Sequence, residues 1–222
     1  MNRRIALAGL LALLTRSAVA APALVEAALR GDTVALRRLL AAGTAVNQRD
    51  ERGRTAALAA TQAGHVQAAK LLISHGADVN AQDDSRDSVF LLAGARGHTE
   101  IVRAAITAGA DLKSTNRYGG TALIPACHYG HVETVRVLLE AGVAVDHVNN
   151  LGWTALLEAV ILGDGGPAHT EIVRLLLARG ADASIADRDG VTPLAHAQRR
   201  GQRAVAELLV AHAGAAASPV RR

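Results

Sequence analysis

The chain has 222 residues, of which half are hydrophobic but only 2% are aromatic, a size that fits one or two domains or a single array of repeats. It carries 24 basic and 20 acidic residues, and three of the basic residues lie within the first 20 positions. Without that segment the balance is 21 to 20, or about +1, so bulk charge gives no support for nucleic-acid binding. A single cysteine, Cys127, excludes an internal disulfide bond.

Residues 1–20 have the three parts of a secretory signal peptide. Arg3 and Arg4 form the positive start, residues 5–14 are apolar, and Ala18-Val19-Ala20 is a small-x-small cleavage signal. The apolar run is too short for a membrane span, which needs about 20 residues. We therefore expect cleavage, export to a bacterial periplasm and no membrane insertion of the mature chain.

Three series of residues recur along the rest of the chain with one common period. Successive members lie 33, 33, 33 and 38 residues apart in the two longer series, and the third series keeps the 33-residue spacing. The series are Gly43, Gly76, Gly109, Gly142 and Gly180; Thr55, Ser88, Thr121, Thr154 and Thr192; and Gly64-His65, Gly97-His98 and Gly130-His131.

The unit at residues 119–151 predicts two helices joined by a tight turn. Thr121 is placed to cap the first helix, and Gly130 allows the chain to reverse. Gly142 stands where a left-handed stop is needed, and residues 146–152 predict a hairpin-like turn. One face of the second helix is apolar, through Val132, Val135, Leu138 and Leu139.

Neither helix of a unit could bury its apolar face alone, so neighbouring units must stack. We expect an all-α solenoid of about six helix–turn–helix units over residues 22–213, followed by a disordered tail at 214–222. Residues 161–169 hold the five extra residues of the long period; their glycines and proline predict a loop and not a longer helix. The predicted units are a first unit at 22–52, followed by repeats one to five at 53–85, 86–118, 119–151, 152–189 and 190–213.

These motifs resemble the ankyrin repeat. Residues 190–197, Gly-Val-Thr-Pro-Leu-Ala-His-Ala, look like its start-of-helix motif, and residues 75–80 and 179–182 look like its end-of-unit motif. Ser88-Val89-Phe90 departs from the usual opening, and the first unit lacks that opening, as a capping unit would. The resemblance implies an ankyrin-repeat solenoid that binds another protein, with no catalysis, metal or cofactor.

The reactive side chains have structural interpretations. His65, His98 and His131 occupy one position in successive units, and His169 joins them after the insertion; in the ankyrin pattern this histidine orders the turn between helices. A single column of side chains roughly 10 Å apart cannot share a metal ion. Cys127 is expected to be buried as a small apolar residue. Asp83, Asp84 and Asp87 predict a solvated turn in preference to a calcium site.

The resemblance also implies where a partner binds, because ankyrin proteins use the turn tips and the exposed face of each first helix. Phe90 falls on a core position, whereas the other three aromatic residues fall on the predicted groove. The predicted binding residues are Arg117, Tyr118, His128, Tyr129, Asn150, Leu151, Trp153, Ile161 and Leu162. The alternative is that these aromatic side chains simply pack on neighbouring turns.

The sequence therefore predicts a monomeric periplasmic scaffold that binds another protein through repeats three and four. One alternative is a ligand-binding or enzymatic accessory protein with a site at 161–169, built with His128, His131 and His169. A second alternative is an effector directed at a host cell.

Overall fold

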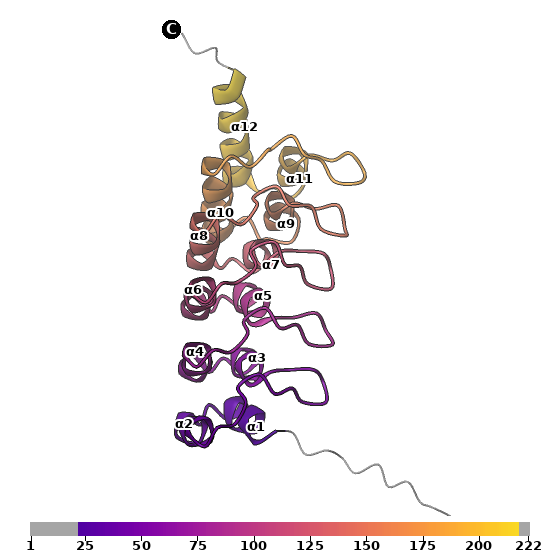
Figure 1. The fold of residues 1–222 in the computed structure, drawn as a ribbon. Coiled ribbons are helices and arrows are strands. Elements are labelled where there is room, and N and C mark those ends of the chain that lie inside the picture. Colours follow the sequence, from indigo (N-terminus) through magenta and orange to yellow (C-terminus); the bar gives the residue numbers. More distant parts are fainter. Residues whose placement is uncertain (1–21, 218–222) are drawn as a thin grey trace, which may run out of the picture.

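The computed structural model describes residues 22–217, so the predicted signal peptide lies outside the described residues. In this range twelve α-helices follow one another in pairs, and the pairs stack in a single row (Figure 1). The only β-structure among the described residues is an isolated bridge between Arg49 and Thr55. The helices are α1 (Ala23–Leu29), α2 (Thr33–Ala41), α3 (Ala56–Gln62), α4 (Val66–Ser74), α5 (Val89–Ala95), α6 (Thr99–Thr107), α7 (Leu123–His128), α8 (Val132–Glu140), α9 (Ala155–Ile161), α10 (Pro167–Ala178), α11 (Pro193–Arg199) and α12 (Arg203–Ala217).

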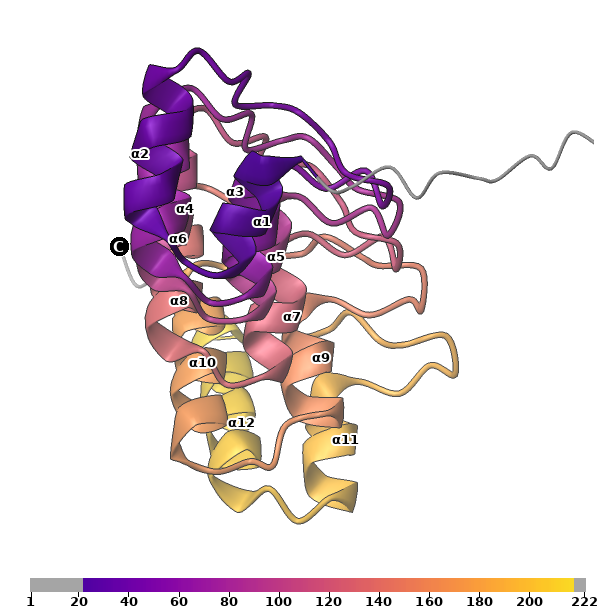
Figure 2. The ribbon, with the colours of Figure 1, turned by 90° about the horizontal axis from the view of Figure 1, so that it is seen from below.

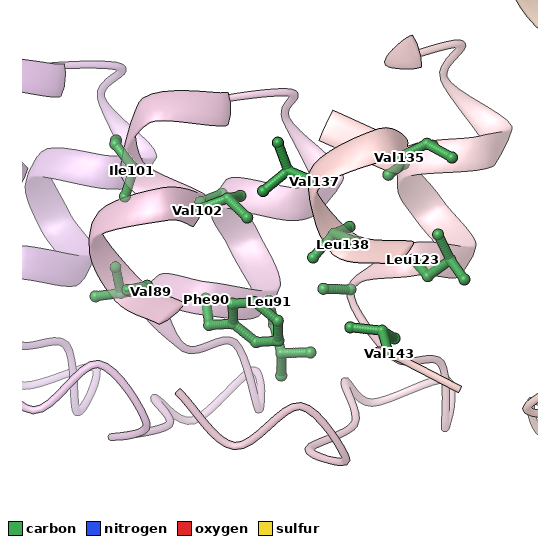
Figure 3. Close-up of a cluster of buried hydrophobic side chains, with 14 of the residues drawn as sticks. Val89, Phe90, Leu91, Ile101, Val102, Leu123, Val135, Val137, Leu138 and Val143 are labelled. Carbon is green, nitrogen blue, oxygen red and sulfur yellow. The ribbon is translucent and has the colours of Figure 1, made fainter. Parts of the chain in front are cut away.

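The helices form two layers with the core between them. The odd-numbered helices lie beside the extended turns and the even-numbered helices lie on the other side (Figures 1 and 2). Phe90 of α5, Leu123 of α7 and Leu138 of α8 are fully buried in this core (Figure 3). The predicted core position of Phe90 and the all-α solenoid are thus confirmed.

The odd-numbered helices, which we call the inner helices, mostly begin as the 33-residue series predicts. Thr55, Ser88, Thr154 and Thr192 each accept a hydrogen bond from the backbone N–H three residues later, at 3.2–3.3 Å. Each cap also fixes where its helix starts, because the cap residue is extended and the next residue is helical.

Thr121 is the exception, and its predicted role as a cap is wrong. Helix α7 begins at Leu123, and the Thr121 hydroxyl is buried without a hydrogen-bond partner. In the other units the fourth residue after the cap donates its N–H to the cap carbonyl, but here that residue is Pro125, which has no N–H. The Thr121 carbonyl instead accepts from the N–H of Ile124 at 3.3 Å, the donor that the hydroxyl would otherwise use.

An aspartate or asparagine side chain holds each of the five turn tips in the same way. An aspartate or asparagine oxygen accepts hydrogen bonds from the backbone N–H groups two and four residues later, at 2.9–3.1 Å. Successive tips are joined as well, since the N–H of Asn150 donates to the carbonyl of Tyr118 at 2.9 Å. The five residues are Asp50, Asp83, Asn116, Asn149 and Asp187. Asp83 therefore holds a turn, as expected.

The insertion in repeat four is only partly a loop. Helix α9 ends at Ile161 and α10 already begins at Pro167, so α10 has 12 residues where α8 has 9. The prediction of a loop over the whole of 161–169 is therefore corrected: residues 162–166 connect the helices, two more residues than join α7 to α8, and the other three extra residues lengthen α10. Pro167 favours this early start, because the first turn of a helix tolerates proline.

The C-terminal helix is longer than predicted. Helix α12 continues to Ala217, into the segment expected to be a disordered tail from residue 214. Residues 218–222 lie outside the described residues. No helix in the described range is both long and apolar enough to cross a membrane.

Candidate functional site

A cleft of about 910 Å³ runs along the inner helices of repeats two to four, beneath the turn tips. Helices α5, α7 and α9 supply its walls, and the turns before α7 and α9 supply its rim. Six of the nine predicted binding residues line it: Arg117, Tyr118, His128, Tyr129, Leu151 and Leu162. The repeat register alone was thus enough to bring these residues together.

Exposed apolar side chains gather in this cleft. Seven large hydrophobic side chains are exposed in the described part of the chain, and four of them line this cleft. A gathering of exposed apolar and aromatic side chains in one concave surface is typical of a binding site. The four are Tyr118 (54% exposed), Tyr129 (59%), Leu151 (48%) and Leu162 (42%).

Both tyrosine rings have neighbours within this chain but keep most of their surface free. Tyr129 stacks on His128, with the ring centroids 4.2 Å apart and the planes 12° apart. The Arg117 guanidinium carbon lies 4.8 Å from the centroid of Tyr118. The rings are therefore positioned by local contacts, not buried against neighbouring turns, and remain available to a partner.

Three predicted binding residues do not line the cleft. Asn150 ties adjacent turns together, since its N–H donates to Tyr118 and its carbonyl accepts from Arg188. Trp153 is half-buried, and its N–H donates to the Asn149 side chain at 3.0 Å. Ile161 is half-buried as the last residue of α9. Their role in binding stays a prediction.

Glu158 of α9 lines the cleft and was not predicted from the sequence. Its side chain is 10% exposed, and among residues 22–217 only Asn149 donates to it, at 3.4 Å. Burial raises the pKa of Glu158 to about 7, although the Asn149 hydrogen bond acts in the opposite direction. The sequence held a signal: the equivalent positions of repeats one to three are Ala59, Leu92 and Pro125.

His128 does not neutralise this carboxyl group. Its Nδ1 lies 3.8 Å from Glu158 Oε1, beyond hydrogen-bonding distance. Burial lowers the pKa of His128, and His169 lowers it further, so near neutral pH the ring is uncharged.

The opposite end of the cleft has a different charge arrangement. Burial, together with Asp83, raises the pKa of Asp87, while Arg117 and Arg96 act in the opposite direction. Two arginines of the chain thus act electrostatically on Asp87 without forming an ion pair within 4.0 Å, whereas no arginine or lysine of the described residues lowers the pKa of Glu158. The cleft thus has one acid with internal cations and one without.

The repeated histidines join neighbouring units. The ring Nε2 of His65 lies 3.0 Å from the carbonyl of Leu29, and that of His169 lies 2.9 Å from the carbonyl of His128. The other ring nitrogen of His169 contacts Asp164 at 2.8 Å. His65 and His169 thus hold the turn between helices by bonding to the preceding unit, and His169 also contacts the connection of its own unit through Asp164. Both His169 nitrogens are therefore engaged.

Cys127 is fully buried, as expected. Burial and the nearby Glu158 hold the pKa of its thiol well above the usual value. The sulfur is therefore a protonated thiol packed in the core of its unit.

Comparison with known proteins shows the family. A family model described as "Ankyrin repeats (3 copies)" matches residues 9–83 and 89–187, which is more than half of the chain. The chain therefore belongs to the ankyrin-repeat family. Among curated proteins, a putative ankyrin repeat protein, YahD of Escherichia coli (strain K12), is 46% identical over 54 residues, which span 24% of this chain and 27% of that protein.

Solved structures agree over most of the chain. An ankyrin repeat domain from Acinetobacter baumannii AYE is 54% identical, with a TM-score of 0.83, over 86% of this chain and 97% of that one. EF0377, an ankyrin repeat protein, is 41% identical, with a TM-score of 0.81, over 85% and 96%. The ankyrin repeat domain of Bcl-3, a member of the IkappaB family, is 26% identical, with a TM-score of 0.75, over 86% of each chain.

Proposed function

We propose that this chain is a non-catalytic periplasmic scaffold that binds another protein through the cleft of repeats two to four. Ankyrin repeats are protein-interaction scaffolds, and the position of the partner surface is the finer part of the proposal. The observation that supports it is the gathering of Tyr118, Tyr129, Leu151 and Leu162 in one cleft. The periplasmic location rests on the signal peptide predicted at residues 1–20.

Tyr129 is the residue whose loss should weaken binding most, because its ring is exposed yet held in place by His128. Truncation of such an aromatic residue costs on the order of 2 kcal/mol of binding free energy, roughly thirty-fold in affinity. We therefore expect Tyr129→Ala to lose most of a partner captured from a periplasmic extract. Binding of the purified partner, measured by calorimetry, would give the affinity ratio.

Val34→Ala is the matched control, because Val34 is 78% exposed on α2, far from the cleft. It should bind as the wild type does. Circular dichroism would establish that both variants are folded. Equal binding by the wild type and Tyr129→Ala would contradict the proposed surface, and a partner lost equally from both variants would show that the loss is not specific to the cleft.

A further inference from the structure

We propose that the repeat-four end of the cleft binds an arginine side chain of the protein partner, with its guanidinium group against the carboxylate of Glu158. This inference rests on the proposed function, because it names the chemistry that the cleft recognises. It is carried by three observations on the described residues: an under-satisfied carboxyl group, an apolar and aromatic rim, and a contrast between the two ends of the cleft.

The carboxyl group of Glu158 lacks donors. Its Oε2 accepts one long hydrogen bond, 3.4 Å from Asn149 Nδ2, and no described residue donates a hydrogen bond to Oε1, which lies 3.8 Å from His128 Nδ1. A carboxylate withdrawn from water is costly unless cationic donors replace the water. In the described part of the chain no lysine or arginine lies within 4.0 Å of it, so a cation from a partner would be the first to pair with this carboxyl group.

The surroundings of Glu158 suit arginine. Tyr129, Leu151 and Leu162 expose apolar surface in the same cleft, and the stem of an arginine side chain packs well on such surface. The ring of Tyr129 offers a face for a planar guanidinium group, which is also matched in shape to a carboxylate. The same cleft already contains one contact between a guanidinium group and a tyrosine ring, because the guanidinium carbon of Arg117 lies 4.8 Å from the centroid of Tyr118.

The two ends of the cleft differ in the charged neighbours of their acidic residues, and this difference assigns the partner's cation to one end. At the repeat-two end, Arg96 and Arg117 favour the ionised form of Asp87 electrostatically, although neither forms an ion pair with it within 4.0 Å. At the repeat-four end, Glu158 stands where repeats one to three have Ala59, Leu92 and Pro125. Of the two cleft acids, Glu158 is therefore the one on which no described arginine or lysine acts, and it is the one that we assign to a partner cation.

The pH dependence of binding distinguishes this charge from a neutral contact. Burial raises the pKa of Glu158 to about 7, and guanidinium stays protonated throughout, so binding requires the ionised carboxylate. From the ionised fraction, affinity should rise about tenfold between about pH 6 and about pH 8. The titratable groups facing Glu158 are Cys127 and His128 of α7. Helices α10 and α11, which also pack on α9, place no described ion-pair partner within 4.0 Å of it.

The test uses the full chain and N-acetyl-arginine methylamide as the probe, followed by ¹⁵N-edited NMR. We expect shifts at Asn149, Glu158 and Leu162, and no shifts there with the citrulline analogue, which has the same shape without the charge. Glu158→Gln should weaken binding at least tenfold at about pH 8 and abolish its pH dependence. Glu140→Gln, the same change on the exposed surface of α8, should bind the probe as the wild type does.

Equal binding of the citrulline analogue, or unchanged binding by Glu158→Gln, would overturn the inference. Tighter binding of N-acetyl-lysine methylamide would overturn the assignment to arginine. The spectrum of Glu158→Gln reports whether that variant is folded. A captured partner that is lost with Tyr129→Ala but retained with Glu158→Gln would overturn this inference and leave the proposed function standing.

Discussion

At the scale of single residues, burial separates aromatic side chains that the sequence predicted for the same binding surface. Tyr118 and Trp153 both lie in turns before an inner helix, yet Tyr118 is exposed in the cleft and Trp153 is half-buried outside it. The repeat register predicted the first placement. It could not predict the second, because the register gives a residue's position in the unit and not how its side chain packs.

Glu158 was missed for a related reason. The sequence pattern singles out exposed aromatic residues as binding candidates, whereas Glu158 lies on a mostly buried face of α9 and still lines the cleft. Its charge is informative only in comparison with Ala59, Leu92 and Pro125, and only the structure shows that no internal cation compensates it.

Glu158→Gln should stabilise the fold in a pH-dependent way. The folded-state pKa of about 7 lies above the ordinary value of 4.5, so between these values the unfolded chain ionises first and stability falls as pH rises. The penalty is absent below about pH 4.5 and complete above about pH 7. We therefore expect the variant to be about 2 kcal/mol more stable at about pH 8 and equal to the wild type at about pH 4. Urea denaturation at both values measures this, and a gain independent of pH would contradict it.

At the scale of the element, helix α7 shows how one residue alters a repeated design. The threonine or serine series predicted the inner helix starts of four units, and it failed where Pro125 removes an N–H group. The length of α10 was missed because glycines and a proline indicate an interruption without saying on which side of it the helix resumes.

The start of α7 can be tested with matched substitutions. Thr154→Val should cost about 1 kcal/mol, because it removes a helix cap. Thr121→Val should cost nothing or stabilise slightly, because its buried hydroxyl has no partner. In a Pro125→Ala background, which restores the missing N–H, Thr121→Val should cost about 1 kcal/mol as well. Urea midpoints measure all of these, and equal costs for Thr121→Val and Thr154→Val in the wild-type background would contradict the account.

At the scale of the whole molecule, each unit packs only on its neighbours, so position in the row determines how far a defect spreads (Figure 1). The family and the stacking of units could be predicted from the 33-residue period. The C-terminal end of the array could not be predicted, because α12 continues through residues 214–217, whose composition is typical of a disordered tail.

The array should respond differently to core truncation at its end and at its middle. Leu209→Ala, in α12, should lower hydrogen-exchange protection in α11 and α12 and leave the other repeats protected. Leu138→Ala, in α8, should cost about 2 to 5 kcal/mol and lower protection on both sides. Exchange measured by mass spectrometry resolves the two patterns, and uniform loss of protection in both variants would show that the array unfolds only as a whole.

The insertion in repeat four, which is divided between the connection 162–166 and a longer α10, has a consequence for how the cleft surface can change. The five extra residues leave the stack intact: His169 still bonds to the preceding unit, and Gln202, 33 residues later, reaches back to the carbonyls of Val160 and Gly163. Chain length can therefore vary at this turn without disturbing its neighbours. The turn is an attachment point beside Leu162 at the cleft, where evolution or a protein engineer can add new recognition segments while the rest of the array is kept.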